Sequence, residues 1–249
     1  RRMVKIAPLF AKELKAYFYS PIAYVVLVVF LAFNSFIFSV LMIVLNDPRM
    51  TIDGSAMQLY FGRTIFLYLV LSIVPAVITM RLIAEERRAG TLEVLMTAPV
   101  TDWELVLSKF LGAWAFFAFL WLPTLLYVAV LRWYSPLDLG PVASGYLGTL
   151  LIGAMFIAIG LLCSALTRNQ IIAAVVSYLL VTVIWIVGVF ESLVSGPLAK
   201  GIFSYLSVFQ HFDGFSKGIV DSRPLVYYLS SAALCLFLTV RVVESQKWR

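Results

Sequence analysis

The chain has 249 residues, of which 62% are hydrophobic and only 13% are charged, and its mean hydropathy is +0.98. About a quarter of the residues in a typical soluble domain are charged, so this composition excludes a water-soluble globular protein and indicates lipid as the solvent. The net charge of +6 does not require a nucleic-acid partner, because the membrane topology accounts for it.

The apolar residues form six charge-free runs of about 17 residues or more, and a helix needs roughly 20 residues to cross the hydrocarbon core. Continuous apolar runs favour helices over a barrel, whose strands alternate over about 10 residues. We therefore predict an all-α membrane protein whose six transmembrane helices cover residues 22–45, 62–83, 105–131, 143–166, 169–190 and 224–243. No internal repeat is visible, so residues 1–249 are expected to form a single transmembrane domain.

An amphipathic segment, residues 1–20, precedes the first predicted span. Its apolar residues recur at helical spacing, and Lys5, Lys12 and Lys15 lie elsewhere around the helix. This pattern is typical of a helix that lies in the membrane interface, with its basic residues near anionic lipid headgroups. A soluble helix docked on a partner is the alternative. No cleavable signal peptide is expected at this end.

Both chain ends are predicted to lie in the cytoplasm. With six spans they fall on the same side of the membrane, and that side receives thirteen of the 19 Lys and Arg residues, against six on the other. The positive-inside rule assigns the richer side to the cytoplasm.

The segment between the second and third spans, residues 84–100, carries the clearest local signals. We expect the second helix to continue as a charged extension through Ala89 and to end at Gly90. Thr91 can cap a short helix over residues 92–97, which Pro99 closes. Thr101 and Glu104 then form a capping box that starts the third span. A segment with such sharp turns is more than a simple linker needs.

The small residues and the polar residues within the spans each have two alternative roles. Small residues in the fourth span let helices approach closely, either within the bundle or at a dimer seam: Gly145, Thr149, Gly153, Ala154, Ala158 and Gly160. Polar residues in the first two spans could line a pathway or form hydrogen bonds between helices: Asn34, Ser35, Ser39, Ser72 and Thr79. The spans otherwise hold almost no ionisable groups, so we do not expect the energy for transport to arise within them.

Residues 191–223, between the fifth and sixth spans, are predicted to lie outside. The segment is rich in glycine but contains an apolar stretch over residues 202–209. We expect a pair of short helices that dip into the outer leaflet as a re-entrant element, with surface helices as the alternative.

The sequence offers no catalytic or metal site. His211 is the only histidine, and Cys163 and Cys235 both fall inside predicted spans. A zinc site therefore lacks ligands, and no phosphate-binding loop with the required Lys and Ser or Thr is present. We expect a non-catalytic chain that binds no metal or cofactor itself.

The segment from Arg81 to Pro99, followed by Lys109, resembles the signature of ATP-binding-cassette (ABC) type-2 permeases, in which a Glu-Arg-x-x-Gly-Thr-Leu-Glu core lies on a coupling helix. The stretches 12–21 and 211–221 look closest to gliding-motility and copper/nitrous-oxide-maturation permeases. The resemblance implies a dimer in the bacterial inner membrane that binds two cytoplasmic ATPase subunits, which hold ATP and Mg²⁺. It implies coupling roles for Glu85, Glu86, Arg87, Arg88, Gly90, Thr91, Leu92, Glu93, Leu95 and Pro99.

The function predicted from these features is that of a permease subunit that couples ATP hydrolysis by another chain to export. Transmission of force to a periplasmic accessory protein is a second mode of action for such a permease. Two other classes remain open at this point, namely a scaffold that recruits a cytoplasmic partner and a membrane-embedded enzyme. The second permease subunit of the implied dimer is either an identical or a different chain.

Overall fold

The structure is a computed structural model, and it describes residues 6–47, 56–62, 65–91, 100–134, 137–190, 196, 201 and 205–246. All regular secondary structure within these residues is helical. The helices in chain order are α1 (Ile6–Phe18), α2 (Pro21–Asn46), α3 (Ala56–Phe61), α4 (Ile65–Thr79), α5 (Ala84–Ala89), α7 (Asp102–Trp121), α8 (Leu125–Tyr134), α9 (Leu139–Leu166), α10 (Gln170–Phe190), α12 (Val208–Ser216) and α13 (Ser222–Ser245).

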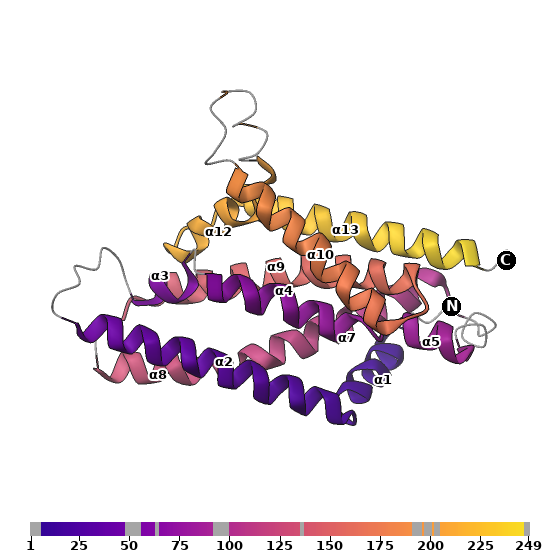
Figure 1. Cartoon of the computed structure of the whole chain (residues 1–249), viewed down its shortest axis with the longest axis horizontal. Coiled ribbons are helices and arrows are strands. Elements are labelled where there is room, and N and C mark those ends of the chain that lie inside the picture. Colours follow the sequence, from indigo (N-terminus) through magenta and orange to yellow (C-terminus); the bar gives the residue numbers. More distant parts are fainter. Residues whose placement is uncertain are drawn as a thin grey trace.

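Six helical stretches in the described residues are long and apolar enough to cross a membrane. They are Pro21–Asn46, Leu67–Ala89, Asp102–Tyr134, Leu139–Leu166, Gln170–Gly188 and Ser222–Ser245. The predicted all-α fold with six spans is thereby confirmed. Figure 1 shows that α1, α5 and the C-terminal end of α13 lie at the same end of the bundle, whereas α3 and α12 lie at the other end.

Local capping explains where several of these helices begin. In α7 the Thr101 hydroxyl accepts a hydrogen bond from the Glu104 amide at 3.3 Å, and the Glu104 carboxylate accepts one from the Thr101 amide at 2.9 Å. This is the capping box that the sequence predicts. The Asp138 and Asp221 side chains cap α9 and α13 in a similar way.

Two of the spans are interrupted, which differs from the continuous helices expected. The chain turns between α4 and α5 at residues 80–83, so the charged extension is a separate short helix. It ends where predicted, at Gly90, whose φ of 71° is the left-handed conformation that glycine adopts most readily. The third span breaks between α7 and α8 next to Pro123, which cannot donate a backbone hydrogen bond.

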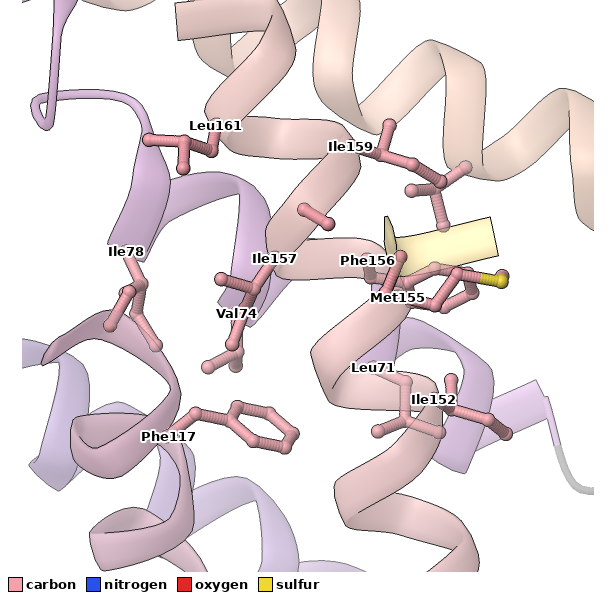
Figure 2. Packing of buried hydrophobic residues seen from close by; sticks show 14 of the residues in the cluster. Leu71, Val74, Ile78, Phe117, Ile152, Met155, Phe156, Ile157, Ile159 and Leu161 are labelled. Carbon is pink, nitrogen blue, oxygen red and sulfur yellow. The ribbon is translucent and has the colours of Figure 1, made fainter. Parts of the chain in front are cut away.

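Helix α9 is the centre of the bundle, and it contacts α4, α7, α10, α12 and α13. Figure 2 shows its apolar side chains, among them Ile157, packed beside Val74 of α4 and Phe117 of α7. Close packing explains its glycines. A methyl group added at Gly153 would lie 2.2 Å from Phe117, one at Gly160 would lie 2.0 Å from Thr79, and one at Gly145 would lie 2.6 Å from Phe61.

The other small residues predicted for close packing, Thr149, Ala154 and Ala158, are also buried. In the single chain, therefore, this surface of α9 packs within the bundle, which is one of the two roles expected for it.

The outer segment before the last span contains α12, which packs on α9. The Ser144 hydroxyl of α9 donates to the Phe215 carbonyl of α12 at 2.6 Å, and Gly148 lies directly under Phe212 and Phe215. A pair of short helices was expected within residues 191–223, and most of residues 191–204 lie outside the described residues.

Candidate functional site

Hydrogen bonds to one side chain of α9 stabilise the break between α4 and α5. The first amide groups of a helix have no partner within it, and α5 has no side-chain cap of its own. The Ser164 hydroxyl of α9 accepts hydrogen bonds from the amides of Ile83 at 3.1 Å and Ala84 at 3.0 Å. It also lies 3.3 Å from the Met80 carbonyl, to which it donates. One buried side chain of α9 therefore fixes the start of α5.

A buried ionic cluster joins α5 to α7 and α1. The ammonium group of Lys109 in α7 lies 2.6 Å from Oε1 of Glu86 in α5 and 3.0 Å from Oε1 of Glu13 in α1. The Lys109 side chain is 1% exposed, and those of Glu86 and Glu13 are 19% and 13% exposed. A buried lysine requires such partners, since removal of a charge from water is costly unless an opposite charge replaces the solvent.

Further polar contacts hold α5 on its other sides. Arg81, in the turn before α5, pairs with Glu85 at 2.8 Å and donates to the Ser20 hydroxyl at 3.1 Å. Arg87 donates to the Ala165 carbonyl at 2.6 Å, close to the C-terminus of α9, where positive charge is favourable. The same carbonyl accepts a hydrogen bond from Gln246, which follows α13.

Helix α1 is packed closely against α7 beside this cluster. The Tyr17 ring stacks on Phe116 with a centroid separation of 4.9 Å, and its hydroxyl donates to the Ile78 carbonyl at 3.0 Å. Burial raises the pKa of the Tyr17 hydroxyl, which therefore remains a neutral donor through the physiological range. A methyl group added at Gly112 would lie 2.9 Å from Cβ of Glu13, so this glycine permits the close approach.

The remaining end of α5 is open to solvent. Arg88, Ala89, Gly90 and Thr91 are all exposed, and we call these residues the α5 tip. Leu92, Glu93, Leu95 and Pro99, which were also predicted to couple the chain to a partner, lie outside the described residues. The coupling role of the whole segment stays a prediction. The structure adds that Glu86 and Arg87 contact other helices of the chain itself, whereas the α5 tip does not face inward.

The polar residues that could line a pathway form hydrogen bonds within the helices and between them. Asn34 accepts a hydrogen bond from Tyr60 at 2.8 Å, and Ser35 lies 2.7 Å from the Tyr127 hydroxyl. Three others donate to backbone carbonyls of their own helices: Ser39, Ser72 and Thr79. Of the five residues, Asn34 and Ser35 therefore form hydrogen bonds between helices, and a role of the set in a pathway stays a prediction.

The described residues contain no group of three or more His, Cys, Asp or Glu side chains that could hold a metal ion. His211 stacks on Tyr227 at 4.6 Å between ring centroids, and its Nε2 lies 3.0 Å from the Tyr205 carbonyl. Cys163 and Cys235 are free thiols.

Sequence reasoning missed the parts of the site that come from distant segments. From the sequence, Lys109 was named only as the residue that follows the coupling segment, and no individual role was assigned to Glu13 in the interfacial helix or to Ser164 in the fourth span. One signal for Lys109 was available, because it is the only charged residue between Leu105 and Leu131 of the predicted third span. A charged residue within a span is a candidate functional group, and it needs a partner.

These features define a multi-pass membrane protein in which a short charged helix at one end of the bundle is joined to several spans. The family model described as "ABC-2 family transporter protein" matches residues 46–242, which is most of the chain. The chain therefore belongs to the ABC-2 transporter family and is a component of membrane transport, and an ABC ATPase partner is implied in general. A comparison with curated proteins finds no match.

Proposed function

We propose that this chain is the permease subunit of an ABC transporter, and that it acts as a dimer with a separate cytoplasmic ATPase that binds ATP and Mg²⁺. Family membership supports the general assignment. Among the described residues of the segment 84–100, the α5 tip is the part that a cytoplasmic partner can reach, since its residues are exposed. The proposed direction of action is export or the transmission of force across the inner membrane, with both chain ends in the cytoplasm.

The observation that carries the coupling mechanism is the contact between Lys109, Glu86 and Glu13. If the ATPase displaces the α5 tip, the ion pair at 2.6 Å pulls α7, and the one at 3.0 Å pulls α1 with it. A buried pair resists separation, because breaking it leaves charge without solvent or a partner. We therefore assign Glu86 to transmission of the movement within the chain, and Arg88 and Thr91 to contact with the partner.

The hydrogen bonds between α5 and α9 provide a second path by which a movement of α5 is transmitted to the bundle. Ser164 holds the start of α5, and Arg87 holds the end of α9. Because α9 also contacts α3, α4, α7, α10, α12 and α13, displacement of α5 would reach the centre of the bundle. Rigid-body movement of packed helices is one of the usual ways in which a local change spreads through a protein.

The proposal is tested by mild-detergent purification of the chain from its native membranes, with mass spectrometry of the proteins that copurify. We expect a stoichiometric ATPase with a phosphate-binding loop. We expect Arg88→Glu, at the α5 tip, to reduce its recovery several-fold, and Arg241→Glu, on the exposed face of α13, to leave recovery unchanged. Absence of an ATPase after gentle crosslinking would contradict the proposal. A partner that binds without any nucleotide-dependent change in the spans would instead favour a scaffold.

A further inference from the structure

A pocket of about 190 Å³ lies beside the ionic cluster, between α1, the start of α2, the end of α4, α5 and α7. Its polar wall contains Glu13, Ser20, Arg81, Glu85, Glu86 and Lys109. The side toward α2 and α4 is apolar and includes Val26 and Val77. One pocket therefore presents charged and apolar surfaces at the end of the bundle that holds α1 and α5.

The apolar side of this pocket continues into a groove between α2 and α4. Val26 and Val77 line both spaces, and the other residues that line the groove are also apolar, from Val25 to Phe33 on α2 and from Leu69 to Val77 on α4. The nine residues from Val25 to Phe33 rise by about 12 Å along the helix axis. The groove is open, because Val29 is 62% exposed and Ile73 is 45% exposed. It can accept one hydrocarbon chain along the surface of the span.

The charges of the pocket indicate which head group would fit. Three carboxylates, from Glu13, Glu85 and Glu86, face two cationic groups, from Arg81 and Lys109, so the lining has one excess negative charge. Oε2 of Glu86 is buried and has no hydrogen-bond partner among the described residues. A buried carboxylate oxygen without a donor is costly, and a cation held against the pocket wall would stabilise the negative charge of this carboxylate. Arg81, which is about one-third exposed, can contact a phosphate.

We propose that this pocket and groove bind a phospholipid with a primary ammonium head group. The ammonium group lies against the carboxylates of the pocket wall, the phosphate lies against Arg81, and one acyl chain lies in the groove between α2 and α4. A purely anionic lipid cannot supply the N–H donor, and the quaternary ammonium of phosphatidylcholine carries no N–H. The lipid contacts α1, α5 and α7 together, so its binding would stabilise the arrangement that the ionic cluster holds.

The test is native mass spectrometry of the delipidated full chain in detergent, titrated with phosphatidylethanolamine, phosphatidylcholine and phosphatidylglycerol of identical acyl chains. We expect retention of phosphatidylethanolamine at least ten-fold above the other two lipids. Val29→Trp fills the groove at an exposed position and should reduce this retention about ten-fold. The matched control is Val28→Trp, because Val28 is 65% exposed on the same helix and does not line the groove.

Glu85→Gln removes one carboxylate from the pocket wall. It should lower the ratio of phosphatidylethanolamine retention to the retention of the other two lipids, without abolishing lipid binding. Equal retention of the three lipids, or a preference for phosphatidylglycerol, would overturn the proposed head group. Unchanged retention in Val29→Trp would overturn the proposed position. Efficient crosslinking of Val29→Cys between two copies of the chain in lipid-saturated detergent would show that a second copy covers the groove, and it would also overturn the proposal.

Discussion

At the scale of single residues, Lys109 stabilises the packing of the helices at the end of the bundle that contains α5. Its side chain is almost fully buried between two carboxylates. Removal of one partner from a buried ion pair costs about 3–5 kcal/mol, because the remaining charge is left without compensation. A pair on the surface contributes only about 0–1 kcal/mol. The two kinds of pair therefore predict very different effects of substitution.

We expect Lys109→Met to lower the free energy of unfolding by about 3–5 kcal/mol, because Glu86 and Glu13 then remain buried without their cation. Lys217→Met is the control, since it removes an exposed pair with Asp213 and should cost less than about 1 kcal/mol. Both values can be measured by denaturant titration in detergent. Adding Glu13→Gln and Glu86→Gln to Lys109→Met should recover part of the loss. If Lys109→Met and Lys217→Met lowered the free energy of unfolding by similar amounts, the stabilising role of the buried ionic cluster would be contradicted.

Gly153 illustrates a different residue-scale constraint, that of packing. A methyl group there would overlap the Phe117 ring of α7, and inserting atoms into a packed core costs about 1–3 kcal/mol. We expect Gly153→Ala to lower stability by this amount in the same titration. Gly214→Ala is the control, because its nearest neighbour would be the Ile219 carbonyl oxygen at an ordinary distance of 3.5 Å. Equal stability of the two variants would show that α9 and α7 are not packed this closely.

At the scale of the elements, α5 depends on α9 for its first hydrogen bonds. Ser164→Ala would leave the buried amides of Ile83 and Ala84 without their acceptor, at a cost of about 1–3 kcal/mol. We expect these two amides to exchange with deuterium at least five-fold faster in the variant. Ser108→Ala is the matched control, because Ser108 is equally buried and donates only to a carbonyl of its own helix. Unchanged exchange at Ile83 and Ala84 would argue against the cap.

The elements differ in how far the sequence predicts them. Hydropathy locates all six spans, and the residues from Thr101 to Glu104 specify the start of α7, because these signals are local in the chain. The break at residues 80–83 was not predicted, since its stabilising hydroxyl belongs to Ser164, about 80 residues further along. For the same reason the ionic cluster could not be assembled from sequence. Glu13 and Lys109 are 96 positions apart, and only the packing of α1 on α7 brings them together.

At the scale of the whole molecule, the proposed function requires that α1, α5 and α7 move together when a partner ATPase changes state. They are joined by buried charge at Lys109 and by close packing at Gly112. Helix α10 belongs to the same bundle and packs mainly on α9 and α4, with a smaller contact to α5. The account therefore predicts that nucleotide changes the position of α5 relative to α10, while α5 and α7 keep their separation.

The most direct test measures these separations by pulsed electron spin resonance in the complex with the copurified ATPase, in a background of Cys163→Ala and Cys235→Ala. Spin labels at Ala89 on α5, Trp103 on α7 and Ile171 on α10 occupy positions that are exposed, and Arg88 and Thr91 stay intact for the contact with the ATPase. On trapping the ATP-bound state, we predict a changed Ala89–Ile171 distance and an unchanged Ala89–Trp103 distance. In Lys109→Gln the Ala89–Trp103 distance should change as well. A chain in which neither distance responds to nucleotide, or in which the Ala89–Trp103 distance changes equally with and without Lys109, would contradict the account.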